Sequence, residues 1–356
     1  MSAAGASAPV AVRGARLAQL SPSYFGMVMA TGIVSLAAAR MGFFGLAWAI
    51  FLLNVAVYAL LWGLNALRAF RYPRRYLADL ISHKTAPGFF TFVAATGVLG
   101  AQVIVLTGWR AVALGLWFVA LALWFALTYT IFTAFTVKKA KPPLVRGLSG
   151  AWLLSVVATQ SIAVLAAMLA AGVVGPYRIE LNFFALSMWL WGGMLYIWVM
   201  TLIFYRYMFF RLSPADLSPP YWINMGAMAI STLAGSLLIA NAGDAPFLAS
   251  ILPFLKGFTV FYWASGTWWI PMLVILAIWR HGYRRFPLTY DPLYWGAVFP
   301  LGMYSVATSE MVEGFGFAFL EWLPQTFFWV ALAAWAAAFI ALLRNLNAVR
   351  RAGRAA

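Results

Sequence analysis

Long runs without charged residues divide the chain into ten segments. Asp, Glu, Lys and Arg are absent from ten intervals of at least 18 residues: 17–39, 41–67, 85–109, 111–137, 147–177, 181–205, 217–243, 257–279, 292–309 and 322–343. An α-helix rises 1.5 Å per residue, so about 20 apolar residues cross the hydrocarbon layer of a bilayer. The pattern predicts an all-α integral membrane protein with ten transmembrane helices between residues 21 and 346, and span lengths of this kind argue against a β-barrel.

Similar segments recur at the start of the odd-numbered spans. Each has a proline followed by aromatic side chains, as in SPSYFG at 21–26, APGFFT at 86–91, SPPYWI at 218–223 and DPLYWG at 291–296. Span 5 is a degenerate copy with Ser149 in the proline position, and the spacings are 65, 62, 70 and 73 residues. Proline fits the first turn of a helix, where its missing N–H is not needed. The repeat predicts five helical hairpins of equal orientation, and this odd number disfavours an inverted repeat.

The odd and even spans differ in side-chain size. Odd spans carry many small residues, which let helices approach closely or leave space beside an axis, whereas even spans are rich in large apolar side chains. We therefore expect the five hairpins to close into a ring around a central pore, with the small-residue helices inside and the bulky helices facing lipid.

Lys and Arg are distributed unevenly between alternate linkers. If the N-terminus is cytoplasmic, 20 of the 24 basic residues fall in cytoplasmic segments. The other side receives four: Arg40, Arg110, Arg178 and Lys256. This is the positive-inside pattern of membrane proteins. It predicts cytoplasmic termini, with short tails at 1–20 and 347–356, and it accounts for the net charge of +16 without nucleic acid as a partner.

Few side chains could support catalysis. The chain has no cysteine, and both histidines, His83 and His281, are expected to be solvated residues of basic loops. The sequence has no cluster with metal-ligand spacing, no nucleophile elbow, no P-loop and no dinucleotide fingerprint. Glu310 and Glu313 follow the ninth span, and Glu310 lies roughly 27 Å beyond Pro292 along a helix, so we interpret it as an outer-loop carboxylate. We expect no enzyme activity, no cofactor and no metal.

The scarcity of ionisable groups inside the spans bears on transport. Proton-coupled carriers usually keep Asp, Glu or His within the membrane, so their absence from the span interiors favours passive conduction. A rim rich in Lys and Arg concentrates anions, although positive-inside topology produces such a rim in any membrane protein. Free N–H groups at the helix starts add a small preference for anions. The residues alone favour anions over cations only slightly.

Three segments carry a resemblance to a known family. FGMVMATGIVS at 25–35, SPPYWINMGAMAISTLAGS at 218–236 and DPLYWGAVFPLGMYSVAT at 291–308 resemble the tellurite-resistance/dicarboxylate transporter family, which includes the plant guard-cell slow anion channels. The resemblance runs from about Ser21 to Leu343. It implies a homotrimer in the lipid bilayer, the inner membrane for a bacterial member, five hairpins around a pore in each subunit, and small inorganic or organic anions as substrates.

The resemblance also implies a pore gate. A phenylalanine on the ninth helix plugs the pore of the channel members, and Phe299 in the Phe-Pro-Leu element is the matching position. Phe299 lies seven residues after Pro292, and the same offset gives four other residues at that level: Met29, Ala94, Val156 and Gly226. The alternative is that Phe299 packs between helices. Pro300 is expected to bend the helix, with Gly296 and Gly302 easing the distortion.

Two further readings stay open. A gradient-coupled carrier of C4-dicarboxylate, sulfite or tellurite-type oxyanions would be alike in sequence to a passive channel. A membrane enzyme or sensor scaffold would need catalytic groups at helix ends or a soluble domain, and the sequence shows neither.

Overall fold

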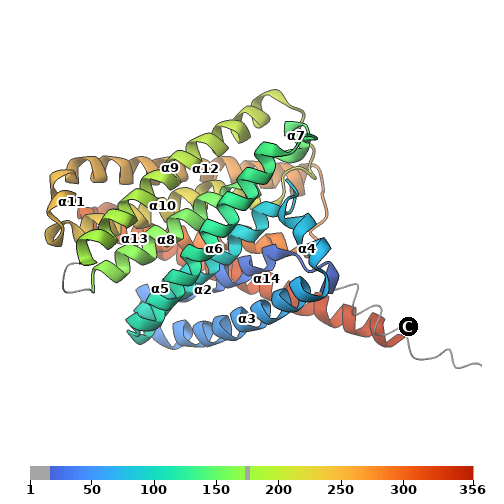
Figure 1. Ribbon diagram of the computed structural model, residues 1–356, viewed down its shortest axis with the longest axis horizontal. Helices are drawn as coiled ribbons and strands as arrows, with labels where there is room; N and C mark the ends of the chain where they lie inside the picture. Colours follow the sequence, from blue (N-terminus) through green and yellow to red (C-terminus); the bar gives the residue numbers. More distant parts are fainter. Residues whose placement is uncertain (1–16, 173–176, 356) are drawn as a thin grey trace, which may run out of the picture.

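The computed structural model describes residues 17–172 and 177–355, and every regular element in these residues is helical. Ten long helices of this part run broadly along the long axis of the molecule (Figure 1). Most of the predicted N-terminal tail, with Arg13 and Arg16, lies outside the described residues. The last helix continues to Ala355. Residues 347–355 of the predicted C-terminal tail are therefore part of this helix.

Five helices form an inner ring. They are α2 (Phe25–Arg40), α5 (Phe90–Thr107), α8 (Leu154–Ala170), α10 (Ile223–Ala240) and α13 (Trp295–Phe315). Each packs against the next in this order, and α13 packs against α2, so the ring closes. In the first four ring helices, 83–94% of the central residues are buried. Burial on all faces suits helices rich in small residues, because their neighbours can approach closely on every side.

Five outer helices surround this ring. They are α3 (Phe44–Arg71), α6 (Arg110–Val137), α9 (Tyr177–Phe209), α12 (Leu252–Ile278) and α14 (Trp322–Ala355). Only 17–50% of their central residues are buried, and their exposed positions carry large side chains such as Leu52, Phe118 and Trp198. An apolar surface of this kind is stable only in lipid. The structure therefore confirms the predicted arrangement of small-residue helices inside and bulky helices outside.

A short turn precedes each ring helix. The five 3₁₀ turns are η1 (Pro22–Tyr24), η2 (Ala86–Phe89), η3 (Gly150–Leu153), η4 (Pro219–Trp222) and η7 (Pro292–Tyr294). Each turn contacts its two neighbours, so the turns form a second closed ring at one end of the helices. The predicted repeat is thus present in local structure, including the fifth span, which has no proline in its turn.

The remaining elements are short connections near the ends of the long helices. They are α4 (Pro73–Leu80), α7 (Leu144–Gly147), η5 (Asn241–Asp244), α11 (Pro246–Ser250), the π-helical turn η6 (Trp279–Tyr283) and η8 (Ala318–Leu320). His83 and His281 lie among these connections and are partly buried, in contrast to the predicted solvated positions. The His83 ring stacks on Phe135 with 3.9 Å between ring centroids, which accounts for its burial.

Nine helices in the described part of the chain are long and apolar enough to cross a membrane. The expected tenth span, α13, falls outside this set although it has 21 residues. Its second half is polar, with Ser305, Thr308, Ser309, Glu310 and Glu313. Within the ring, however, α13 packs between α2 and α10 as the other ring helices pack between their neighbours.

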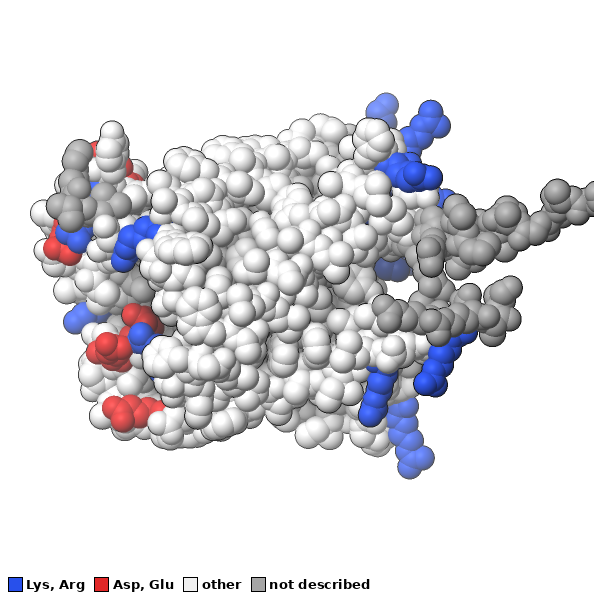
Figure 2. Space-filling view, turned by 90° about the horizontal axis from the view of Figure 1, so that it is seen from below, with Lys and Arg blue, Asp and Glu red and all other residues white. Residues whose placement is uncertain are grey.

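Charged residues gather at the two ends of the molecule, with a broad uncharged band between them (Figure 2). The end that holds the 3₁₀ turns, α4 and α7 is called the basic end here, because most of the Lys and Arg side chains lie there. The opposite end carries Arg40 and the glutamates Glu310, Glu313 and Glu321, and is called the acidic end. The band confirms that the charge-free intervals of the sequence lie side by side in the fold.

Buried arginines hold the connections at the basic end against the outer helices. Arg68 and Arg206, each near the end of an outer helix, are 1% and 3% exposed and pair with Asp79 and Asp216 in the following connections. Burial acts to raise the pKa of Asp216, but hydrogen bonds donated by Ser213 and the charge of Arg206 outweigh it and lower that pKa. The carboxylate therefore stays ionised and holds the connection that leads into η4.

Candidate functional site

Two equivalent glycines let neighbouring ring helices approach each other closely. A methyl group added to Gly302 of α13 would lie 2.9 Å from Cγ2 of Ile33 on α2. The same addition at Gly32 would lie 2.5 Å from Cγ1 of Val98 on α5. Gly302 and Gly32 both lie ten residues after the proline of their repeat, and Ile33 and Val98 both lie eleven residues after theirs. Neighbouring ring helices therefore meet in the same register.

Outer helices hold the ring through a repeated hydrogen bond. The Trp335 indole of α14 donates to Thr31 over 3.0 Å, and the Trp124 indole of α6 donates to Thr159 over 2.8 Å. Tyr58 of α3 bonds to Thr96 over 2.9 Å. In each case the outer helix belongs to the preceding hairpin, and the closure of the ring makes α14 the outer helix that precedes α2. Thr31 and Thr96 lie nine residues after the prolines of their repeats. Thr159 lies nine residues after Gly150, so Gly150, and not Ser149, is the position equivalent to those prolines.

Three sides of α13 are occupied by other helices. Gly302 faces α2, and the ring of Pro300 lies against Gly226 of α10. On the outer side, Tyr304 and Thr308 bond to Thr267 and Trp263 of α12 over 2.8 and 3.1 Å. Successive residues of an α-helix are rotated by about 100°, so these contacts fix the orientation of the remaining residues. The side opposite to α12 carries Phe299, Met303, Val306 and Glu310.

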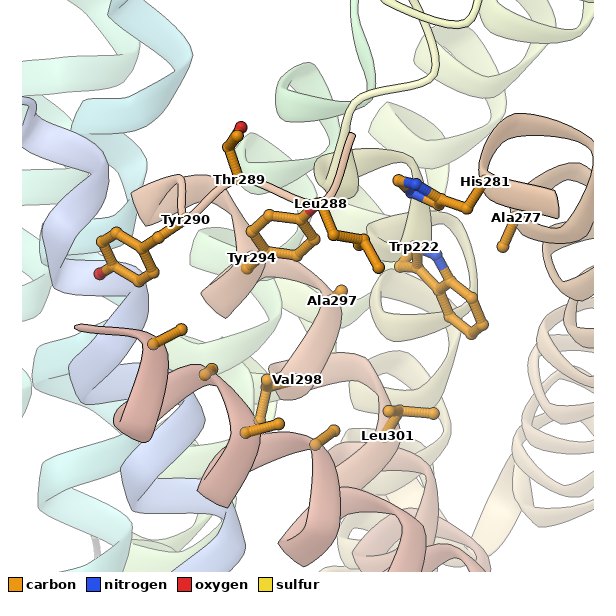
Figure 3. Close-up of a pocket in the computed structure, with 14 residues that line it drawn as sticks. Trp222, Ala277, His281, Leu288, Thr289, Tyr290, Tyr294, Ala297, Val298 and Leu301 are labelled. Carbon is orange, nitrogen blue, oxygen red and sulfur yellow. The ribbon is translucent and has the colours of Figure 1, made fainter. Parts of the chain in front are cut away.

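A cavity of about 470 Å³ lies on the outer side of α13 (Figure 3). Ala297, Val298 and Leu301 line it from α13, together with alanines of α14 and Ala277 of α12. Phe299 does not line this cavity. The cavity is therefore separate from the ring interior, and its position agrees with the helical rotation that turns Phe299 toward the inside.

The residues predicted for the gate level lie on five different ring helices. Met29 and Phe299 are 2% and 1% exposed, Ala94 and Val156 are fully buried, and Gly226 is buried against Pro300. Gly226 of α10 is in direct contact with Pro300 of α13, the residue that follows Phe299.

The predicted bend residues have a packing role as well. Gly302 permits the close approach of α2, and a methyl group added to Gly296 would lie 3.5 Å from Ile223 of α10. Pro300 lies inside α13, which continues through it from Trp295 to Phe315.

Exposure increases along the inward side of the ring helices toward the acidic end. Residues near the level of Phe299 are at most 2% exposed, and two turns further Leu36 and Val306 reach 9%. A further turn along, Val105 of α5 is 49% exposed. The inward residues are thus closed to solvent at the middle of the ring and become more exposed toward the acidic end.

A charged cluster lies at the acidic end of α2 and α13. Arg40, the last residue of α2, pairs with Glu310 and Glu313 of α13 over 2.7 and 2.5 Å, and its Nε donates to Ser309 over 3.2 Å. Glu310 belongs to α13 instead of an outer loop, and its side chain is 23% exposed, which corrects the sequence interpretation. The pairing with Arg40 was not predicted. A signal was available, because Arg40 and Glu310 both lie 18 residues after the proline of their repeat.

The described residues contain no group of three or more His, Asp or Glu side chains that could hold a metal ion. The features of the site are instead a closed ring of helices, a buried inward face and a charged mouth. Together they define a multi-pass membrane protein built around a closed ring of helices.

Comparison with known proteins identifies the family. The chain belongs to the SLAC1 family, because the family model described as voltage-dependent anion channel matches residues 19–343. An uncharacterised transporter of Methanocaldococcus jannaschii is 23% identical over 336 residues, which cover 92% of this chain and 94% of that protein. A sulfite efflux pump of Trichophyton rubrum is 23% identical over 344 residues, covering 91% and 90%. These matches confirm the family resemblance of the sequence.

A shorter relative is more similar. An uncharacterised membrane protein of Mycobacterium tuberculosis is 42% identical over 161 residues, which cover 45% of this chain and 81% of that protein. The family and these relatives are channels, transporters or membrane proteins by name, and the chain is accordingly a member of an anion channel and transporter family.

Proposed function

We propose that this protein is a passive anion channel whose path follows the axis of the inner ring and is closed by Phe299. The observation that carries the proposal is the orientation of α13. Its contacts with α2, α10 and α12 leave Phe299 on the inward side, and the phenyl ring is 1% exposed at the closed middle of the ring. A large apolar ring in a narrow passage excludes water and ions.

The level of Phe299 supports this role. Met29, Ala94 and Gly226 occupy the equivalent positions of three other repeats and are all smaller than phenylalanine. In α8 the hydrogen bond between Trp124 and Thr159 favours Val157 at this level in place of Val156. One large side chain among four smaller ones can close a passage that the other four leave open.

The inward face also supports passive conduction. Between the level of Phe299 and the charged cluster, the inward residues of α13 are Met303 and Val306, and those of α2 are Ile33 and Leu36. These side chains cannot bind or release a proton, whereas a proton-coupled carrier needs titratable groups on its path. Conduction would then follow the electrochemical gradient of the anion.

Pro300 supplies a mechanism for opening. A proline inside a helix removes one backbone hydrogen bond, and the ring of Pro300 rests on Gly226 of the neighbouring helix. A small movement of α13 at this point would change the rotamer of Phe299 and open the passage. Gating would then be a local change of one side chain.

The gate is tested by Phe299→Ala in protein reconstituted into liposomes. We expect the flux of nitrate and chloride to rise at least about tenfold, equivalent to lowering the barrier by roughly 1.4 kcal/mol. The matched control is Phe328→Ala on α14, because Phe328 is also 1% exposed but stacks on Phe43 away from the ring axis. A flux that is the same in both variants would exclude Phe299 as the gate.

A coupled carrier of sulfite or related oxyanions is the second candidate. The match to a sulfite efflux pump over 91% of the chain favours it. Sulfite, malate and tellurite flux should be compared with and without a pH gradient across the liposome membrane. Flux that requires the gradient would support the carrier, and flux that ignores it would support the channel.

The orientation and assembly are proposals as well. The concentration of Lys and Arg at the basic end supports a cytoplasmic location for that end and for both termini. A bacterial inner membrane location and a homotrimer follow from the family resemblance.

A further inference from the structure

Arg40 and Glu310 occupy equivalent positions in two adjacent repeats. Each lies eleven residues, or about three helical turns, beyond the level of Met29 and Phe299 and on the same side of its helix. The corresponding residues of the other repeats are Val105, Met168 and Leu237, counting from Gly150 in α8. The mouth of the ring is therefore lined by three apolar side chains and one ion pair.

The ion pair is accessible to solvent at the acidic end. The Arg40 side chain is 32% exposed, Glu310 is 23% exposed and Glu313 is 75% exposed. One Arg40 nitrogen, Nη2, contacts both carboxylates, while Nε donates to Ser309. The two carboxylates together outnumber the guanidinium, so the cluster carries a formal charge of −1 and repels an approaching anion in this arrangement.

We propose that Arg40 is an anion-binding site at the mouth of the path, and that Glu310 and Glu313 are tethered competitors that occupy it in this conformation. The inference rests on the proposed anion path. A guanidinium binds carboxylates and oxyanions through the same paired N–H donors, so a carboxylate, nitrate or sulfite can take the place of a glutamate. Glu313 is largely exposed and can move into solvent, which leaves Arg40 free to receive an anion.

Three variants separate the roles of the two charges. Glu310→Gln removes one competitor and keeps a side chain of similar size, so the half-saturating concentration for nitrate flux should fall roughly two- to fivefold, the range expected for a partly exposed ion pair. Arg40→Gln should raise it by a similar factor. In the double variant Arg40→Gln/Glu310→Gln the half-saturating concentration should stay above that of the wild type, because removing the competitor cannot restore affinity once the binding group is gone.

Arg178 is the matched control for the loss of an ion-paired arginine at the acidic end. It pairs with Asp244 over 3.0 Å and is 25% exposed, but it lies on the outer helix α9. Arg178→Gln should leave the half-saturating concentration unchanged. Equal effects of Arg40→Gln and Arg178→Gln would show that the arginines act only through general electrostatics or stability, and would overturn the proposal.

A binding measurement makes the result independent of flux. In detergent, sodium nitrate and sodium sulfite should raise the unfolding temperature of Glu310→Gln at lower concentrations than that of the wild type, with no such stabilisation in the double variant. This outcome without any flux would support the site and reject the channel. Flux in the wild type with identical anion stabilisation in Glu310→Gln and the double variant would reject the site alone. If Arg40→Gln fails to fold, the comparison between Glu310→Gln and the wild type still decides the question: equal anion stabilisation in the two proteins would reject the site.

Discussion

At the scale of single residues, the closest approach near the proposed gate is between Gly226 and Pro300. A methyl group added to Gly226 would lie 2.7 Å from Cγ of Pro300 and 3.0 Å from its Cβ. A proline ring cannot rotate away, so Gly226→Ala should push α13 out of position. We expect a loss of about 1–3 kcal/mol of stability, the usual cost of overpacking. The unfolding temperature in detergent measures it.

Gly63→Ala provides the comparison for this substitution. Gly63 lies on α3 and has no atom of another element within 4 Å of an added methyl group. Alanine is favoured over glycine inside a helix by roughly 0.5–1 kcal/mol, so this variant should be at least as stable as the wild type. Equal unfolding temperatures for the two variants would contradict the steric role of Gly226.

The sequence predicts some of these residues better than others. Phe299 could be selected because it lies in a recognisable family element, and Gly226 followed from the repeat offset. The ion pair of Arg40 with Glu310 was missed, because the closure of the ring between the first and last repeats brings together residues 270 positions apart. Linear order hides this neighbourhood, although the equal offset from Pro22 and Pro292 indicates it.

At the scale of elements, the outer helices position the ring helices through buried side chains. Trp124 of α6 is 6% exposed, and its indole N–H donates to Thr159, which is fully buried in α8. Thr159→Val keeps the shape but leaves the indole N–H without an acceptor. We expect a loss of about 0.5–2 kcal/mol, because interhelical hydrogen bonds in membranes are individually modest. Thermal unfolding in detergent provides the measurement.

Thr136→Val is the control, on α6, the same outer helix that carries Trp124. The Thr136 hydroxyl bonds to the carbonyl of Phe132 in its own helix and is exposed. The substitution should therefore change stability by less than about 0.5 kcal/mol. A loss at position 136 as large as that at 159 would remove the interhelical bond as the explanation.

The start of four repeats was predictable from the proline and aromatic pair, because four of the 3₁₀ turns and the helices after them fall where the motif places them. The fifth repeat shows the limit of this method. Without a proline, the sequence repeat predicts Ser149 as the equivalent position, whereas the Trp124 to Thr159 hydrogen bond favours Gly150. The turn η3 begins at Gly150 with Ser149 at its N-cap, as η1 begins at Pro22 after Ser21. The local sequence carries the same register, because Trp152 lies two residues after Gly150 as Tyr24 lies two residues after Pro22.

At the scale of the whole molecule, the hairpin arrangement was predictable because the size of side chains alternates between spans. Ring helices need small residues on all sides, and outer helices need large apolar residues toward lipid. The least apolar ring helix, α13, is the one that carries Phe299, Pro300 and the glutamates of the charged cluster. The polar second half of α13 lowers the mean hydropathy of this helix below that of the other ring helices. The helix that departs from the apolar pattern is thus the one that carries the proposed functional residues.

The orientation of the whole molecule can be tested with single cysteines, because the natural chain contains none. Lys141→Cys places an exposed thiol at the basic end, and Glu321→Cys places one at the acidic end. In spheroplasts of a bacterial host, a maleimide that does not cross the inner membrane should label Glu321→Cys and spare Lys141→Cys. After permeabilisation, both should be labelled. The asymmetry follows from the basic end, where the excess of Lys and Arg resists transfer across the membrane. The reverse pattern would invert the orientation of the protein and place Arg40 on the cytoplasmic side, so the same experiment decides from which compartment an anion first meets Arg40.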